Sequence, residues 1–249
     1  MCHPEVPPGT PIPDVRVSEV AIPTGDGGAM SALVAYPATT PAPAILVIND
    51  VFGRGPFYDN LSRRIAQAGY VAVDPEFFWR LDPLAEPTRE AAMARAPKLD
   101  APRMLADLGD ALDWLKKQAE VKADKLGLIG FCMGGTAALN LTAIRDDIAA
   151  PVAYYGFPAR GPIDRADQMH GPILGHWGTE DTGVGIENVR ALSAKLTARG
   201  TPHTFHEYEG LGHGFLKAFL EDESTPGYAQ ACTSWTRTIA FWRERFSGR

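Results

Sequence analysis

Strand-like runs alternate with segments of helical periodicity along most of the chain, and no other feature of the sequence restricts the fold as strongly. The runs that we interpret as strands are 44–50, 70–75, 125–130, 150–156, 171–178 and 203–209. The segments with helical spacing of apolar residues are 56–69, 101–120, 133–145, 186–200 and 225–246. Strands that alternate with helices predict an α/β fold, with a mostly parallel central sheet and helices on both of its faces.

The N-terminal part departs from this alternation. Residues 1–14 are rich in proline and predict an irregular arm. The segments VRVSEVAI (15–22) and MSALVAYP (30–37) alternate apolar and polar residues on either side of the turn TGDGG, which predicts an antiparallel hairpin. Residues 76–100 are polar, contain several prolines and predict a long excursion at a strand end. No repeat, low-complexity tract or linker divides the chain, so we expect residues 15–249 to form a single domain.

Charge and cysteine content limit the partners and the compartment. The 249 residues carry a net charge of −6 at pH 7, and nucleic acids and anionic membranes require basic surfaces, so we expect neither partner. Cys2, Cys132 and Cys232 are too few and too scattered for a disulfide framework, which favours a reducing compartment. The N-terminus lacks a signal-peptide pattern, and no apolar stretch approaches the roughly 20 residues of a membrane-spanning helix. We therefore expect a cytoplasmic protein, of an oligomeric state that the sequence leaves open.

Cys132 lies in GFCMGG, between the strand-like run 125–130 and the helical segment 133–145. Gly-x-Cys-x-Gly between a strand and a helix is the nucleophile-elbow pattern, with cysteine in place of serine. The turn is sharp and leaves no room for side chains at its flanks, which explains Gly130 and Gly134. Free N–H groups at the helix start favour the thiolate. A free cysteine is otherwise a small buried apolar residue, but this context favours a nucleophile.

Two backbone donors for a negative oxygen are expected beside this turn. The residue after the nucleophile supplies one of them, which is the N–H of Met133. The loop after the first buried strand supplies the other, which is the N–H of Val51. Together they predict an oxyanion hole for a tetrahedral intermediate.

A thiol nucleophile requires a base, and the base requires an acid that orients it. In hydrolases built on such sheets, the order along the chain is nucleophile, acid, histidine. GTEDTG places Asp181 after the run 171–178, with Glu180 beside it as the alternative acid, and GLGHGF places His213 after the run 203–209. The order Cys132, Asp181, His213 is correct. Asp181 is also suited to cap the helix that begins near Ile186 or to close an Asx turn.

The sequence offers little support for a metal or nucleotide site. His203 and His206 are three positions apart in a strand, so they face opposite sides and do not chelate one metal. The glycines of GRG (53–55) follow a strand, but the third glycine of a dinucleotide-binding loop is missing. We expect neither a metal nor an organic cofactor.

Five segments together resemble the dienelactone hydrolase (carboxymethylenebutenolidase) family of the α/β-hydrolase superfamily: GFCMGG, NDVFG, AGYVAVDPEFF, GTEDTGV and GLGHGF. The resemblance extends over about residues 15–245. It implies the α/β-hydrolase fold and hydrolysis of an enol-lactone ring, with dienelactone opening to maleylacetate in the breakdown of aromatic compounds. The family has an acidic residue that contacts the thiol, usually the glutamate of E-x-F-G, and DVFG puts Asp50 at that place. Asp50 is equally compatible with a strand-end turn.

The resemblance also implies a site for the substrate carboxylate, which the family binds with two arginines. PEFFWR matches the family's DLYxR segment at Arg80. The second arginine lies four residues past the histidine, where this chain has Lys217, which keeps the charge but lacks a forked guanidinium. Both residues are otherwise ordinary surface charges. The aromatic residues expected to line an apolar pocket, or to be plain core, are Phe52, Phe78, Trp79 and Phe215.

The sequence thus predicts a cysteine-dependent hydrolase that cleaves an ester or an enol lactone, a small and possibly anionic molecule, through a thioester. Cys132 attacks the carbonyl with help from His213 and Asp50. The N–H groups of Met133 and Val51 bind the oxyanion, and water then cleaves the thioester. The alternative is a non-catalytic receptor or carrier for a small molecule on the same scaffold.

Overall fold

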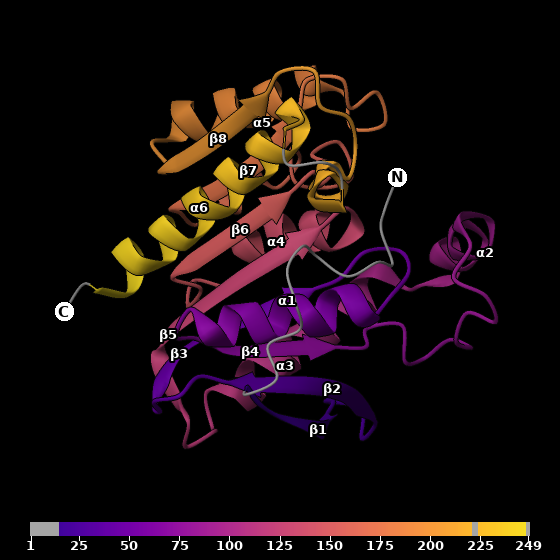
Figure 1. Cartoon of the computed structure of the whole chain (residues 1–249), viewed down its shortest axis with the longest axis vertical. Helices are drawn as coiled ribbons and strands as arrows, with labels where there is room; N and C mark the ends of the chain where they lie inside the picture. The colour runs from indigo at the N-terminus through magenta and orange to yellow at the C-terminus, as the bar shows by residue number, and fades with distance from the viewer. Residues whose placement is uncertain (1–14, 221–223, 248–249) are drawn as a thin grey trace. The chain divides into compact units, whose positions relative to one another are not determined.

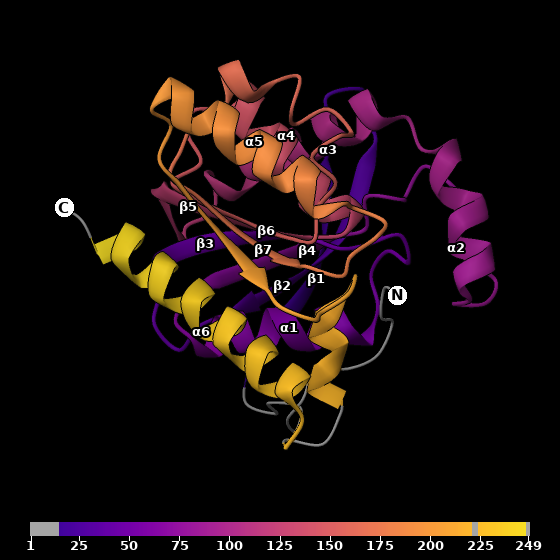
Figure 2. The same ribbon diagram turned by 90° about the horizontal axis from the view of Figure 1, so that it is seen from above.

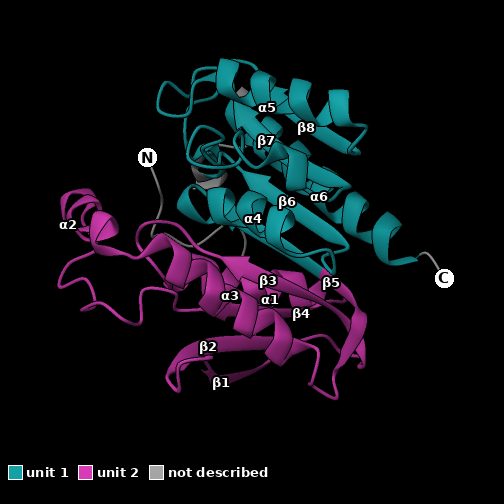
Figure 3. Cartoon of the chain, turned by 180° about the vertical axis from the view of Figure 1, so that it is seen from behind, with its two compact units in different colours: residues 1–3, 127–249 teal, residues 4–126 magenta. Residues whose placement is uncertain are grey.

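The structure is a computed structural model and describes residues 15–220 and 224–247. The chain divides into two compact units (Figure 3), of which unit 1 comprises residues 1–3 and 127–249 and unit 2 comprises residues 4–126. The single domain predicted for residues 15–249 stays a prediction. The irregular arm predicted for residues 1–14 lies outside the described residues.

The described part of unit 2 contains four complete strands in the order β1-β2-β4-β3 (Figure 1). Their bounds are Arg16–Pro23 for β1, Ala29–Tyr36 for β2, Ala42–Ile48 for β3 and Val71–Pro75 for β4. β1 pairs with β2 in antiparallel register from Arg16 opposite Tyr36 to Pro23 opposite Ala29, which confirms the predicted hairpin. β2 is antiparallel to β4, and β3 is parallel to β4.

Two helices cover the strands of unit 2. α1 (Pro56–Gln67) packs on β2, β3 and β4, whereas α3 (Ala101–Leu115) packs on β1 and β3, on the opposite face (Figure 2). Apolar residues at helical spacing explain both, and the buried side chains of α3 include Leu108 and Leu112. The predicted excursion 76–100 contains a further short helix, α2 (Arg89–Arg95), and the 3₁₀ helix η1 (Ala96–Lys98).

Among the described residues of unit 1, the strand pairs are all parallel, in the order β5-β6-β7-β8. β5 runs from Val121 to Phe131 and so begins in unit 2, and the other strands are β6 (Ala150–Tyr154), β7 (Ile173–Gly178) and β8 (His203–Tyr208). The helices are α4 (Met133–Ile144), α5 (Ile186–Arg199) and α6 (Pro226–Ser247), with the 3₁₀ helices η2 (Ala166–Gln168) and η3 (Phe215–Leu220). α4 and α5 lie on one face of these strands and α6 on the other (Figure 2). The predicted fold class is therefore confirmed.

α4 lies unusually close to β6 because small residues form the contact. A Cβ atom added at Gly135 would lie 2.6 Å from the carbonyl oxygen of Tyr154, and one at Gly156 would lie 2.6 Å from the carbonyl carbon of Gly135. Both backbones would have to separate to admit a side chain. This close approach positions the start of α4, where Cys132 lies.

α2 was missed because the sequence prediction read residues 76–100 by their prolines and polar residues. A local signal was present: Thr88 is an N-cap whose hydroxyl accepts from the N–H of Ala91 at 3.2 Å, and the strong helix formers REAAMAR follow it. β5 likewise begins at Val121 rather than at residue 125, because its first part carries exposed polar side chains that hide the apolar signal.

Candidate active site

Cys132 occupies the sharp turn between β5 and α4. It is the N-cap residue of α4, with φ 56° and ψ −113°, in a region of backbone space that side chains with a Cβ rarely adopt. Such a conformation costs on the order of 1–3 kcal/mol and persists only where surrounding contacts hold it. Here the N–H of Cys132 donates to the carbonyl of Tyr154 at 3.0 Å, and its carbonyl accepts from the N–H and the hydroxyl of Thr136 at 3.0 and 3.2 Å.

The glycine at the start of this turn is required by a backbone contact. A Cβ atom at Gly130 would lie 2.1 Å from the carbonyl oxygen of Gly134, so the strand and the first helical turn would collide. The sequence analysis predicted that the flanks of this turn leave no room for a side chain, and the contact at Gly130 agrees. The result is a cysteine that is 4% exposed, at the N-terminus of a helix whose first N–H groups have no intrahelical acceptors.

His213 and Asp181 are brought together by the loops that follow β8 and β7. Nδ1 of His213 lies 2.7 Å from Oδ2 of Asp181. The other carboxylate oxygen, Oδ1, accepts from the N–H groups of Gly183 and Val184 at 3.1 and 3.0 Å. Asp181 therefore closes an Asx turn and holds the histidine at the same time. A carboxylate on Nδ1 keeps the proton on that nitrogen and makes Nε2 the basic one.

The loop after β6 contacts both His213 and the residues at the beginning of α4. The ring of His213 lies 5.1 Å from that of Tyr155 and 5.3 Å from that of Phe157, measured between centroids. Tyr155 also lies 6.2 Å from Phe131, the residue before the cysteine, and Phe157 donates its N–H to the hydroxyl of Thr136 at 2.8 Å. Two aromatic rings thus flank the imidazole and are tied to the elbow.

Sequence reasoning missed Tyr155 and Phe157. Tyr155 is the second non-glycine residue with positive φ among the described residues, at 38°, and its N–H donates to the carbonyl of His176 at 2.8 Å. The available signal was YYGF at the carboxyl end of a buried strand, where side chains of a site gather. Phe215 lies beneath this group, 2% exposed and 5.6 Å from Tyr155 by ring centroids, so its contacts are those of a core residue. Its predicted place in a substrate pocket stays a prediction.

The loop after β3, in unit 2, contains two further predicted residues. Asp50 is buried, and its Oδ1 accepts from the N–H of Phe52 at 2.8 Å while its carbonyl accepts from the N–H of Gly53 at 3.1 Å. These bonds match the turn role that the sequence left open for it. Val51 is also buried, and its carbonyl accepts from Nη2 of Arg95 at 3.2 Å. The catalytic role of Asp50 stays a prediction.

Arg80 is engaged by two carboxylates. Its Nε and Nη2 each donate to Asp107 at 2.8 Å, and its Nη1 and Nη2 donate to Asp26 at 2.8 and 3.1 Å. The guanidinium also lies 4.0 Å from the ring centroid of Trp79, whose Nε1 donates to Asp107 at 3.0 Å. Substrate binding by Arg80 stays a prediction, and a ligand would compete with both acids. The side chain of Lys217, in η3, lies outside the described part of the structure.

A cavity of about 420 Å³ in unit 2 contains three of the predicted aromatic residues. Its lining includes Phe52, Phe78, Trp79, Arg54, Glu76 and Arg95. Neither of the two arginines in the lining was predicted as a site residue. Glu19 balances part of this charge, since Arg54 donates to it at 3.0 and 2.8 Å, whereas desolvation raises the pKa of Glu76 and so disfavours its charged form.

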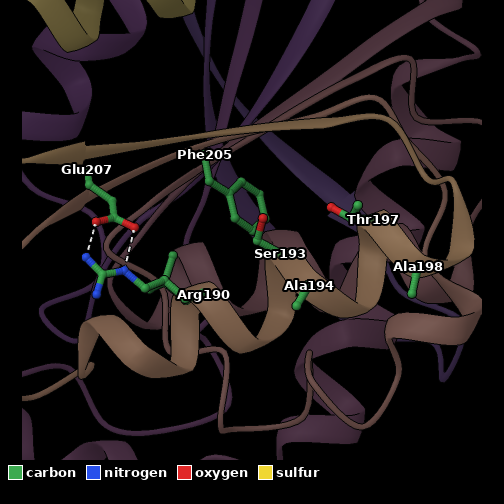
Figure 4. Close-up of a pocket in the computed structure, with 8 residues that line it drawn as sticks. Arg190, Ser193, Ala194, Thr197, Ala198, Phe205 and Glu207 are labelled. Carbon is green, nitrogen blue, oxygen red and sulfur yellow. Dashed lines mark hydrogen bonds and ion pairs between the residues drawn. The ribbon is translucent and has the colours of Figure 1, made fainter.

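A second groove, of about 480 Å³, lies in unit 1 between α5 and β8 (Figure 4). Arg190 bounds it, donating to Glu207 at 3.1 and 2.7 Å, and Phe205 and Ser193 face the same space. No predicted site residue lines this groove, so it is not a candidate for the hydrolytic centre. Within residues 15–220 and 224–247, no group of three or more His, Cys, Asp or Glu residues could hold a metal ion. None of the helices in these ranges combines the length and hydropathy of a membrane span.

A buried hydrogen-bond network joins β6, β7 and β8 to α6. His176 is fully buried, with Nδ1 2.8 Å from the hydroxyl of Tyr208 and Nε2 3.1 Å from the hydroxyl of Thr238. The hydroxyl of Thr238 also lies 2.8 Å from that of Tyr154, and Arg237 donates to Tyr208 at 3.2 Å. Burial, with smaller contributions from His206 and Arg237, lowers the pKa of His176 well below its usual value. His176 is therefore a neutral structural residue, in line with the sequence analysis, which did not place it in the site.

The fold is expected to lose stability below about pH 6.5, the usual pKa of histidine. The unfolded chain then takes up a proton at residue 176 that the folded chain excludes, so acid favours unfolding. His176→Gln removes this titration and should reduce the loss of unfolding free energy between about pH 7.5 and about pH 5.5 by about 1 kcal/mol. Urea unfolding at both pH values measures this loss, with His170→Gln, at an exposed position, as the control. An equal loss of unfolding free energy in the wild type and in His176→Gln would contradict the conclusion that the folded chain keeps His176 neutral.

Comparisons with known proteins identify the family of this chain. A family model described as the dienelactone hydrolase family matches residues 30–246. A carboxymethylenebutenolidase of Rhodococcus opacus is 33% identical over 211 residues, covering 81% of each chain, and one of Pseudomonas putida is 28% identical over 221 residues, covering 86% of this chain and 90% of the relative. The crystal structure of a candidate dienelactone hydrolase from Klebsiella pneumoniae has a TM-score of 0.82 at 26% identity, over 92% of this chain and 99% of that one. The chain therefore belongs to the dienelactone hydrolase family, a family of lactone and ester hydrolases with the α/β-hydrolase fold.

Proposed function

We propose that this protein hydrolyses an ester or an enol lactone of the dienelactone type, with Cys132 as the nucleophile and a thioester as the intermediate. The observation that supports the proposal best is the strained backbone of Cys132 at the N-terminus of α4, in the same unit as the hydrogen-bonded pair His213 and Asp181. Strain of this kind is kept where function requires a side chain to project from a turn. The order nucleophile, acid, histidine along the chain agrees.

In the first half of the proposed reaction, the sulfur of Cys132 attacks the carbonyl carbon of the substrate. The thiol proton passes to Nε2 of His213, whose Nδ1–H donates to Asp181. The carboxylate stabilises the imidazolium that forms, without taking its proton. A tetrahedral oxyanion results. Its collapse breaks the bond to the ester oxygen, which takes up the proton from Nε2 of His213, and leaves a thioester on Cys132 and a neutral histidine.

Two backbone N–H groups are proposed to bind that oxyanion, those of Met133 and Val51. Among the residues that the structure describes, neither N–H has a hydrogen-bond partner. An unpartnered donor at a buried residue such as Val51 is uncommon, since more than about 90% of buried backbone groups are paired. Donors that wait unpaired for developing charge are what an oxyanion hole requires.

In the second half, water attacks the thioester while His213 removes its proton. A second oxyanion forms at the same carbon and collapses with loss of the thiolate, which recovers the proton from Nε2 of His213. A thiolate is a better leaving group than an amine, so ordinary amides are expected to be poor substrates. Enol esters and enol lactones release a stabilised enolate and suit this nucleophile. The names of the relatives from Rhodococcus opacus and Pseudomonas putida denote hydrolases of such an enol lactone.

Trapping the thioester tests the proposal. The protein is mixed with an enol lactone, quenched in acid within milliseconds to seconds, digested and weighed by mass spectrometry. Because the leaving oxygen of a lactone stays attached to the acyl group, the peptide that contains Cys132 should gain the mass of the whole lactone. Cys232→Ala should give the same adduct, since Cys232 lies in α6 outside the proposed site. An adduct on another residue, or tight binding with neither adduct nor turnover, would overturn the proposal, and the latter would favour a receptor or carrier.

A further inference from the structure

Arg95, the last residue of α2, lies against the loop that follows β3. Its Nη2 donates to the carbonyl oxygens of Val51 and Phe52, at 3.2 and 3.0 Å. The guanidinium lies 3.9 Å from the ring centroid of Phe78, and the residue is 8% exposed. A guanidinium buried this far needs compensating contacts, and two carbonyl dipoles and an aromatic face provide them. Its Nε has no partner among the described residues.

The other donors of this loop are already bound. The N–H of Phe52 donates to Oδ1 of Asp50, and the N–H of Gly53 donates to the carbonyl of Asp50. The N–H of Arg54 donates to Oε2 of Glu76 at 3.1 Å. Among the N–H groups of residues 51–54, only that of Val51 is therefore without an acceptor in the described structure.

Close packing leaves the loop little freedom on the side of Arg95. A Cβ atom at Gly53 would lie 2.9 Å from Oε1 of Glu76 and 3.3 Å from Nη2 of Arg95, and the φ of Gly53 is 79°. The positive φ favours glycine at this position, and a larger residue would also have to displace the ends of the Glu76 and Arg95 side chains. The loop is held between its own turn and two side chains, Glu76 and Arg95, which come from the segment after β4.

We propose that Arg95 is a positioning residue for the oxyanion hole. A peptide unit is planar, so a carbonyl bound to Arg95 fixes the orientation of the whole unit. Binding the carbonyls of Val51 and Phe52 fixes two consecutive units, and the bond from Gly53 to the carbonyl of Asp50 fixes the unit that carries the Val51 N–H. Without the guanidinium, the two carbonyls lose their donor, and the loop can rotate so that the Val51 N–H turns away from the oxyanion. This inference rests on the proposed function.

Kinetics of two reactions at Cys132 test the role of Arg95. Hydrolysis passes through oxyanions, whereas alkylation by iodoacetamide displaces iodide at a saturated carbon and forms none. Arg95→Gln is expected to lower kcat for an activated ester by about 100-fold, at the lower end of the loss seen when one oxyanion donor is removed. The KM is expected to change by less than about threefold, and the alkylation rate to stay at the wild-type value, because ground-state binding and the thiol are untouched. Arg95→Lys keeps the charge and a hydrogen-bond donor, so its kcat should lie between that of the wild type and that of Arg95→Gln.

The matched control is Arg16→Gln. Arg16 is also an arginine of unit 2 over an aromatic ring, 3.6 Å from the ring centroid of Tyr36, but it contacts neither Val51 nor Phe52. Its kcat for the ester and the rate at which iodoacetamide alkylates its Cys132 should equal those of the wild type. Thermal unfolding establishes that each variant is folded. Unchanged hydrolysis in Arg95→Gln, or equal losses in hydrolysis and alkylation, would overturn the inference. Failure of the proposed function would look different, since Cys132→Ala would then keep its turnover whatever Arg95 does.

Discussion

Cys132→Ala is expected to lower kcat for an activated ester or an enol lactone by at least about 10⁴-fold, because it removes the atom that forms the thioester. What remains is the smaller contribution of the oxyanion donors and of substrate binding. The strained turn should survive in the variant, since the hydrogen bonds that hold residue 132 involve its backbone N–H and carbonyl. Initial rates of ester and lactone hydrolysis, measured on both proteins in parallel, provide the comparison.

Cys232→Ala is the control for this substitution. Cys232 is half-buried in α6, is also a free cysteine, and belongs to the same unit. Its replacement should leave kcat within about twofold of the wild type. Turnover that survives the loss of Cys132, or that disappears with Cys232, would refute the assignment of the nucleophile.

Asp181→Asn is expected to lower kcat by about 10³- to 10⁴-fold while the fold persists, and the geometry gives the reason. Oδ1 of Asp181 accepts from the N–H groups of Gly183 and Val184, so the single oxygen of an asparagine is held at that place. The amide nitrogen then faces Nδ1 of His213, which must accept instead of donate. The proton of the imidazole moves to Nε2, and the histidine can no longer take a proton from the thiol there.

The control for Asp181→Asn is the neighbouring acid. Glu180 is exposed, and Glu180→Gln changes the net charge by the same amount without touching the imidazole. Its kcat should stay within about twofold of the wild type. A small effect of Asp181→Asn, together with an unchanged pH profile, would mean that Asp181 closes the turn and does not orient the base. Similar losses in both variants would indicate a general effect of charge.

Arg80 was predicted from a family motif, whereas Arg95 is found only through its contacts in the structure. The match of PEFFWR to a family segment singles out Arg80, but the guanidinium donates to Asp107 and Asp26, which are distant in sequence. Arg95 belongs to no recognisable motif. It lies in α2, which was not predicted because the surrounding segment is polar and rich in proline. Only its hydrogen bonds to the carbonyls of Val51 and Phe52 suggest a role in the proposed oxyanion hole.

The sequence alone predicted the fold class, the order of the strands and of the longer helices, and the loops that contain the proposed site residues. It could do so because these depend on short-range patterns: apolar runs, helical periodicity, and glycines at Gly130 and Gly134 around a sharp turn. Three features appear only in the three-dimensional structure. Asp181 both closes a turn and binds His213, Tyr155 and Phe157 flank that histidine, and Arg95 contacts the loop after β3. Each joins residues from separate strands or helices, and the chain carries no local signal of where such side chains meet, because packing of the whole unit sets those distances.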